Sequence, residues 1–331
     1  MASQPITAPR AVEKATPRRS PTSVGSPAFR AAAAAWLEGR LGVAVPPSGI
    51  GACVGTKELV SGLPGWLRLR DPSRDTVLYP AVSYPTYAMG AVLARCRPVA
   101  VPVDGAGRVR LDDIDDEDAA RALCLWVNSP GNPAGGLDDL PAAAAWGRAR
   151  GIPVISDECY VEFTWEGPPR TILDAGLDGV IAAHSLSKRS NLAGLRSGFY
   201  AGDPELVAFL LEIRKHAGLM TPGPVLAAAT VALSDQAHVE TQRARYWERL
   251  VRLREVVALA GAEAPLPGGG FYLWVPAPGG DDWGFTERLA AEGGVLASPG
   301  EFYGDAGRGH VRLAAVAPLA QLDLVAARLG G

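Results

Sequence analysis

One stretch of the sequence, residues 184–199, gathers side chains that suit phosphate binding and carbonyl chemistry. It reads HSLSKRSNLAGLRSGF and begins at the carboxyl end of an expected strand, where open α/β sheets bind ligands. The hydroxyls of Ser185 and Ser187 and the guanidinium of Arg196 could hold a phosphate, leaving the amine of Lys188 free to react with a carbonyl. A strand-end lysine is also common as a solvated surface group, so Lys188 alone does not decide between the two.

The spacing in this stretch resembles the lysine motif of fold-type I aminotransferases, which use pyridoxal 5'-phosphate (PLP). That motif is S-x-S-K followed by G-x-R-x-G, and the longer string is similar to the N-succinyldiaminopimelate aminotransferase branch. The resemblance implies that Lys188 binds the cofactor covalently and that Ser185, Ser187 and Arg196 hold its phosphate. It also implies that Lys188, once released, moves the proton of the substrate Cα.

Two further segments that follow expected strands resemble motifs of the same family. Asp157 and Tyr160 stand in a D-x-x-Y arrangement, which assigns Asp157 to the protonated pyridine nitrogen and Tyr160 to the ring hydroxyl. Residues 128–135, NSPGNPAG, resemble N-x-P-x-N-P-T-G, in which Asn132 contacts that hydroxyl, although Ala134 replaces the usual Thr or Ser. Taken alone, the first segment could be a capping Asp beside a core Tyr, and the second an ordinary Pro/Gly turn.

Two segments nearer the N-terminus resemble the remaining cofactor contacts. Thr56 and Lys57 lie in a G-T-K-E element like the one whose backbone amides bind the phosphate at a helix N-terminus. Tyr84 opens a Y-P-T-Y segment, in which the first aromatic residue of the family motif stacks on the pyridine ring. A buried tyrosine near a sheet edge would give the same local pattern.

The C-terminal part supplies the candidate for substrate binding. Residues 268–272 resemble the G-G-[FY] strand start of the family, and residues 310–313 resemble the segment whose arginine grips the substrate α-carboxylate. Arg312 is therefore the candidate, with Arg308 as the alternative, because a guanidinium binds a carboxylate through two parallel hydrogen bonds. We also expect residues 214–216, Arg-Lys-His, near the site without assigning them a role.

The resemblance covers about residues 20–330, and its main departure is at the front. Where the branch has Y-G-[ST]-P, this chain reads Val24-Gly25-Ser26-Pro27, so the tyrosine expected to reach the partner subunit's phosphate is a valine. The substrate-lining arm that usually precedes this stretch is not recognisable. This departure weakens the assignment of the substrate more than that of the cofactor.

Composition excludes several other classes of protein. Hydrophobic residues make up 48% of the 331 residues, and 32 basic residues against 35 acidic ones leave a net charge of -3, which gives no general attraction to nucleic acid or anionic lipid. The longest nearly apolar run, Val225–Leu233, is far below the ~20 residues that span a bilayer. The cysteines and histidines are scattered, so we expect no metal site and buried thiols of a cytoplasmic protein.

Short apolar runs alternate with helical patterns such as 140–150, which predicts an α/β fold with a mostly parallel, doubly wound sheet. We expect strands at 77–79, 99–103, 123–128, 154–157, 180–185 and 199–201, then a smaller α+β part with strands near Val295 and Val311 and a last helix at 319–329. The predicted organisation is a disordered leader (1–22), an N-terminal helix packing with the small domain (23–42), a large PLP-binding domain (43–235) and a small domain (236–331).

The expected activity is transamination in a cytoplasmic homodimer, because the family builds its sites across the subunit interface. Glutamate and 2-oxoglutarate would be one couple, and N-succinyl-L,L-diaminopimelate with its oxo form the other, in lysine biosynthesis. A PLP-dependent lyase or cyclase, or an aminotransferase with another substrate in specialised metabolism, remains an alternative. A non-catalytic regulatory relative would need a DNA-binding domain, which about 22 leader residues cannot supply.

Overall fold

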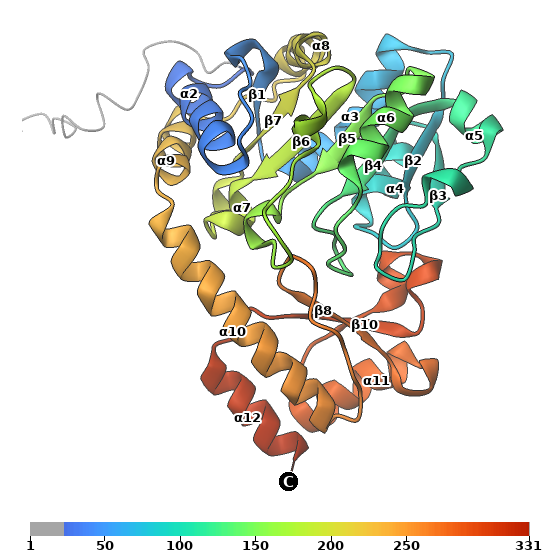
Figure 1. The fold of residues 1–331 in the computed structure, drawn as a ribbon, viewed down its shortest axis with the longest axis vertical. Helices are drawn as coiled ribbons and strands as arrows, with labels where there is room; N and C mark the ends of the chain where they lie inside the picture. The colour runs from blue at the N-terminus through green and yellow to red at the C-terminus, as the bar shows by residue number, and fades with distance from the viewer. Residues whose placement is uncertain (1–22, 331) are drawn as a thin grey trace, which may run out of the picture.

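A seven-stranded sheet forms the centre of the larger part of the protein, within the residues 23–330 that this computed structural model describes (Figure 1). The strands are β1 (Ile50–Cys53), β2 (Thr76–Pro80), β3 (Arg97–Val101), β4 (Ala122–Asn128), β5 (Val154–Asp157), β6 (Val180–Ser185) and β7 (Gly198–Gly202). Their order is β1-β7-β6-β5-β4-β2-β3, and β7 runs antiparallel to both of its neighbours. The predicted mostly parallel sheet is confirmed.

Helices cover both faces of this sheet because its central strands are buried on both sides, as in β4, where every residue is buried. One face packs α2 (Pro27–Trp36), α6 (Leu140–Arg150) and α9 (Gly223–Ser234) into one apolar cluster. The other packs α3 (Thr56–Arg70), α4 (Thr86–Leu93) and α8 (Pro204–His216) into a second cluster. The short helices α5 (Asp116–Ala120) and α7 (Leu186–Arg189) complete this part.

The smaller part follows α9 and has its own sheet and core. Helix α10 (Ala237–Leu259) follows α9 and leads away from the large sheet into the smaller part, where it packs against α12 (Leu319–Leu329) (Figure 1). There β8 (Tyr272–Pro276), β10 (His310–Ala314) and β9 (Ser298–Pro299) form an antiparallel sheet in the order β8-β10-β9, beside α11 (Asp282–Arg288) and α12. The strand expected near Val295 is wrong by several residues, since pairing with β10 begins only at Ser298. We keep the division near residue 235 as a proposal.

The N-terminal helix does not pack mainly on the small domain, so that expectation is wrong. Helix α2 lies against α9 and β1, because its apolar side chains Phe29, Ala33 and Trp36 enter the core of the large sheet. A wider turn continues it over Leu37–Leu41, and Gly42 ends it with a left-handed φ of 75°. Arg40 reaches the small part through an ion pair with Glu240. The expected disordered leader lies outside the described residues.

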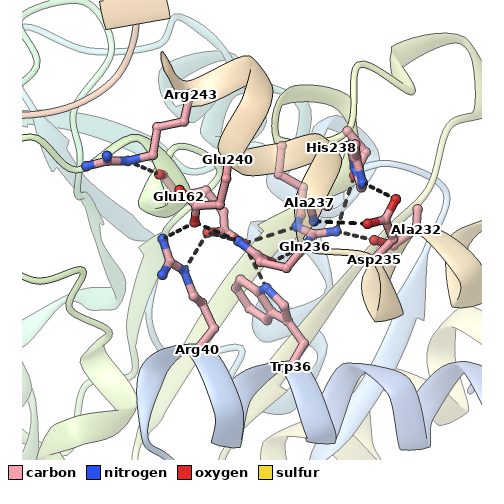
Figure 2. A network of polar contacts seen from close by, with 12 residues as sticks. Trp36, Arg40, Glu162, Ala232, Asp235, Gln236, Ala237, His238, Glu240 and Arg243 are labelled. Atoms are coloured by element: carbon pink, nitrogen blue, oxygen red, sulfur yellow. Dashed lines mark hydrogen bonds and ion pairs between the residues drawn. The ribbon is translucent and has the colours of Figure 1, made fainter. Parts of the chain in front are cut away.

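A buried carboxylate, Glu162, joins three separate segments of the chain (Figure 2). Its Oε1 accepts hydrogen bonds from Trp36 Nε1 at 2.8 Å and Arg189 Nε at 3.2 Å. Its Oε2 accepts from Arg40 Nε at 2.7 Å and Gln236 Nε2 at 3.1 Å. Burial raises the pKa of Glu162, but the charges of Arg189 and Arg40 outweigh that effect and hold it below its usual value. The network therefore ties α2 and the start of α10 to α7.

Replacing Glu162 with alanine should lower the free energy of unfolding by about 3 kcal/mol or more, because buried Arg189 loses its counter-charge. Chemical denaturation of the cofactor-free protein measures this change. The matched control is Glu240→Ala, which removes a half-exposed partner of the same Arg40 and should cost about 0.5 kcal/mol. Equal losses in the two variants would contradict a special role for the Glu162 network.

Candidate active site

A cavity of about 350 Å³ opens where the large sheet meets the smaller part of the protein. The last residues of β4, β5 and β6 reach it, since the carboxyl ends of neighbouring parallel strands meet at one edge of a sheet. The residues to which the family motifs assign a role all line this cavity: Thr56, Lys57, Tyr84, Asn132, Asp157, Tyr160, Ser185, Ser187, Lys188, Arg196 and Arg312. Their individual roles remain predictions.

Lys188 lies on α7, the short helix that starts directly after β6. Ser185 caps this helix, because its Oγ accepts a hydrogen bond from the backbone amide of Ser187 at 3.2 Å. The ammonium nitrogen lies 6.0 Å from the ring centre of Tyr160 and 5.8 Å from that of Phe271. Burial lowers the pKa of Lys188, and Arg312 adds to this effect. More of the lysine is therefore neutral and able to attack a carbonyl carbon.

Asp157 places a carboxylate at the buried end of β5. Its Oδ2 accepts a hydrogen bond from Tyr87 Oη at 2.9 Å, and its Oδ1 accepts from the Cys159 amide at 3.2 Å. Burial raises the pKa of Asp157, and the hydrogen bonds from Cys159 and Tyr87 only partly offset that rise. The carboxylate therefore suits a cation placed in the cavity, such as a protonated ring nitrogen.

The opposite wall of the cavity suits a phosphate. Helix α3 begins there at Thr56, and its first backbone amides are free of partners within the helix. Arg196, held at a left-handed φ of 54°, extends its guanidinium over Gly55. The φ of 76° at Gly55 favours glycine, and a Cβ there would displace the guanidinium at the flexible end of Arg196. The hydroxyls of Ser185 and Ser187 complete this wall.

Arg312 reaches the cavity from β10 and supplies a cation on the side of the small domain. Its Nη1 donates to Asn132 Oδ1 at 2.9 Å, and its guanidinium lies 4.2 Å from the ring centre of Tyr272 and 4.9 Å from that of Tyr303. In the described part of the chain, its buried Nε has no hydrogen-bond partner. Arg308, the alternative, is exposed and paired with Glu301 and does not line the cavity.

The segment 214–216, expected near the site, does not line the cavity, but Arg214 binds Glu58 in the first turn of α3, next to the lining residues Thr56 and Lys57. Arg214 is fully buried and pairs with Glu58 at 2.6 Å, while Lys215 and His216 are exposed and contact Glu212. Glu58 also accepts a hydrogen bond from the Val54 amide at 2.9 Å. Arg214 therefore stabilises the turn before α3 through Glu58.

Several lining residues were not selected from the sequence: Val60, Asn128, Cys159, Ala193 and Tyr272. Most of them lie inside motifs that were recognised. Asn128 organises its loop, since its Oδ1 accepts the Asn132 amide at 2.8 Å. Tyr272 is the last residue of the G-G-G-F-Y motif, and its hydroxyl lies 3.0 Å from that of Tyr160. The motif could have pointed to Tyr272. Its contact with Tyr160 could not be predicted, because the two residues are 112 positions apart.

Comparison with known proteins agrees with this geometry. The family described as aminotransferase class I and II matches residues 5–329. The chain belongs to this family. It is a PLP-dependent transaminase of fold type I, so the predicted family, enzyme class and cofactor are confirmed.

Three similar proteins illustrate the range within the family. The 4-dedimethylamino-4-oxo-anhydrotetracycline transaminase OxyQ of Streptomyces rimosus is 43% identical over 93% of this chain and 84% of its own length. The LL-diaminopimelate aminotransferase of Aquifex aeolicus is 32% identical over 97% of this chain and 85% of its own length. The structure of a probable N-succinyldiaminopimelate aminotransferase from Thermus thermophilus has a TM-score of 0.84 at 32% identity, covering 92% of this chain and 83% of that one.

Removing the Arg196 side chain should weaken PLP binding roughly ten- to hundredfold, the usual cost of losing a hydrogen bond to a charged group. Fluorescence titration of the cofactor-free protein with PLP measures this loss. Arg308→Ala is the matched control, because it removes an exposed arginine outside the cavity and should leave PLP affinity unchanged. Wild-type affinity in Arg196→Ala would contradict the assignment of the phosphate wall.

Lys188→Ala should slow the reaction with amino acids by roughly 10²-fold or more, because the group that moves the Cα proton is lost. Borohydride reduction should fix PLP covalently to the wild-type protein and not to the variant. Lys215→Ala, which changes an exposed lysine on α8, should behave like the wild type in both measurements. Unchanged activity in Lys188→Ala would overturn the assignment of the reactive amine.

Proposed function

We propose that the transaminase uses glutamate and 2-oxoglutarate as one couple and N-succinyl-L,L-diaminopimelate with its oxo form as the other. The observation that carries the proposal is the single cavity that holds Lys188, Asp157 and Arg196 together with Arg312. The similarity to the Thermus and Aquifex proteins supports a substrate of the diaminopimelate type. Lysine biosynthesis would then be the place of this reaction.

When bound, PLP supplies an electron sink for the electron pair left at the substrate Cα. In the proposed arrangement, residues of this chain orient the substrate and move its proton. Arg312 binds the substrate carboxylate and thereby orients the Cα–H bond. The Nζ of Lys188 takes the proton from Cα, and its lowered pKa makes the neutral amine available for this step.

The other side chains hold the cofactor in this proposal. Asp157 keeps a proton on the ring nitrogen through its negative charge, and Tyr160 and Asn132 bind the ring oxygen. Tyr84 stacks on the ring, and a cationic Lys57 lies 5.5 Å from the ring centre of Tyr84. The phosphate lies against Thr56, the main chain of Lys57, Ser185, Ser187 and Arg196.

A second candidate is transfer of the amino group to a ketone in specialised metabolism. It is favoured by the Streptomyces relative, whose 43% identity exceeds the 32% of the diaminopimelate enzymes and whose name specifies an oxo-anhydrotetracycline. Both candidate functions use glutamate as the amino donor, so the residues proposed for that half of the reaction are the same in both. The alternatives of a PLP-dependent lyase or cyclase depend on which Cα bond is aligned with the cofactor ring.

We also propose that the protein works as a homodimer in the cytoplasm. The exchange of the usual tyrosine for Val24 would leave this dimer without one contact to the partner's phosphate. Among the described residues, no helix has the length and apolar character that crossing a membrane requires.

Glutamate should convert the yellow, lysine-bound form of the purified protein into the colourless pyridoxamine form, with release of 2-oxoglutarate. Stopped-flow absorption and product analysis measure both changes. The aminated protein is then offered the oxo form of N-succinyl-diaminopimelate or a polycyclic aromatic ketone, and return of the yellow colour identifies the acceptor. A protein that ignores glutamate, or that yields eliminated or cyclised products, would contradict the proposed substrates.

A further inference from the structure

Tyr272 contacts two parts of the candidate site and has no role in the reaction proposed above. It is the first residue of β8, it is buried, and it pairs with Ala314 on β10. Its ring faces Arg312, whose guanidinium carbon lies 4.2 Å from the ring centre. Its hydroxyl lies 3.0 Å from the hydroxyl of Tyr160. One side chain therefore links the candidate carboxylate-binding residue to a candidate cofactor-binding residue.

The ring contact restricts how Arg312 can turn. Two aromatic faces, those of Tyr272 and Tyr303, lie within 5 Å of the guanidinium, and Asn132 accepts a hydrogen bond from its Nη1. The two rings and the Asn132 hydrogen bond, which come from three side chains of the site, therefore restrain the guanidinium. The unpartnered Nε identified above lies along its edge, which is where a guanidinium meets a carboxylate.

The hydroxyl contact has a defined direction once Tyr160 binds an oxygen of the cofactor. A phenol has one proton, so a Tyr160 that donates this proton to the ring oxygen can only accept at its second contact. Tyr272 is then the donor in the 3.0 Å hydrogen bond. Burial raises the pKa of both tyrosines, so both stay protonated at neutral pH. Donation by Tyr272 polarises the Tyr160 hydroxyl and strengthens its own donation.

We propose that Tyr272 is a positioning residue with two separable parts: its ring orients Arg312 toward the substrate carboxylate, and its hydroxyl donates to Tyr160 beside the cofactor oxygen. This inference rests on the roles proposed above for Arg312 and Tyr160. Other titratable or charged groups act on the tyrosine pair, and they stay in place in both Tyr272 variants below: Asp157, Cys159, Lys188, Arg312, Tyr303 and Tyr246.

Tyr272→Phe removes only the hydroxyl. The visible absorption of the bound cofactor is titrated with pH in the absence of substrate. The midpoint of this titration should move to higher pH by about half a unit, because the hydrogen bond from Tyr160 to the ring oxygen anion becomes weaker. The dissociation constant of glutarate, a dicarboxylate without an amine, should stay within about twofold of the wild type, since the ring that faces Arg312 remains.

Tyr272→Leu removes the ring as well. The dissociation constant of glutarate should rise roughly three- to thirtyfold, the range expected for a lost cation–π contact. The pH titration should shift as it does in Tyr272→Phe. Tyr246→Phe is the matched control, because it removes a neighbouring buried hydroxyl that contacts Asn191, and it should change neither measurement.

An unshifted titration in Tyr272→Phe, or an equal loss of glutarate affinity in both variants, would overturn the proposal. The pH titration needs only the Tyr272→Phe variant. It therefore still tests the proposal if a thermal melt shows that the Tyr272→Leu protein does not fold. Neither measurement depends on turnover of glutamate. A wild-type protein that ignores glutamate would therefore contradict the proposed substrates while both comparisons at Tyr272 remain readable.

Discussion

The carboxylate of Asp157 is buried at the end of β5, and its charge constrains the whole site around it. Tyr87 and the Cys159 amide donate to it, yet burial still raises its pKa. A cation must therefore face this carboxylate if it is to stay ionised. Two cations meet that requirement. One is Lys188, which lines the same cavity from α7, and the other is a PLP ring with a protonated nitrogen.

Glu162 shows the opposite solution to the same physical problem. It is buried too, but two arginines, a tryptophan and a glutamine of this chain compensate its charge, and its pKa lies below the usual value. Glu162 therefore stabilises the fold, whereas Asp157 remains available to bind a cation in the cavity. The two are connected through α7, because Arg189 binds Glu162 and the preceding Lys188 enters the cavity.

The family and the cofactor are shown by the whole chain's similarity to known proteins, whereas the substrate is not. Proteins named for a diaminopimelate substrate are 32% identical to this chain, and one named for an oxo-anhydrotetracycline is 43% identical. The reaction type is common to these names. Tyr272 and Tyr303 are the aromatic faces that lie against Arg312, the candidate for binding the substrate carboxylate.

Local patterns in the sequence were enough for the elements and the reactive groups. Strands β5 and β6 and helices α6 and α12 have the predicted bounds, because apolar runs and capping residues act within a few positions. The site motifs stand at strand ends, and this topology brings them into one cavity. The short strand β1, Ile-Gly-Ala-Cys, was missed because glycine and alanine give little β signal.

Contacts between distant segments were decided only by the tertiary structure. Helix α2 packs on α9 rather than on the small domain, Tyr87 binds Asp157 70 positions away, and Arg312 lies against Tyr272 on a paired strand. The sequence by itself determined the family and the candidate residues for its chemistry, since each motif is local. Only folding decided which side chains support them, because packing and charge compensation depend on neighbours that the chain brings together from far apart.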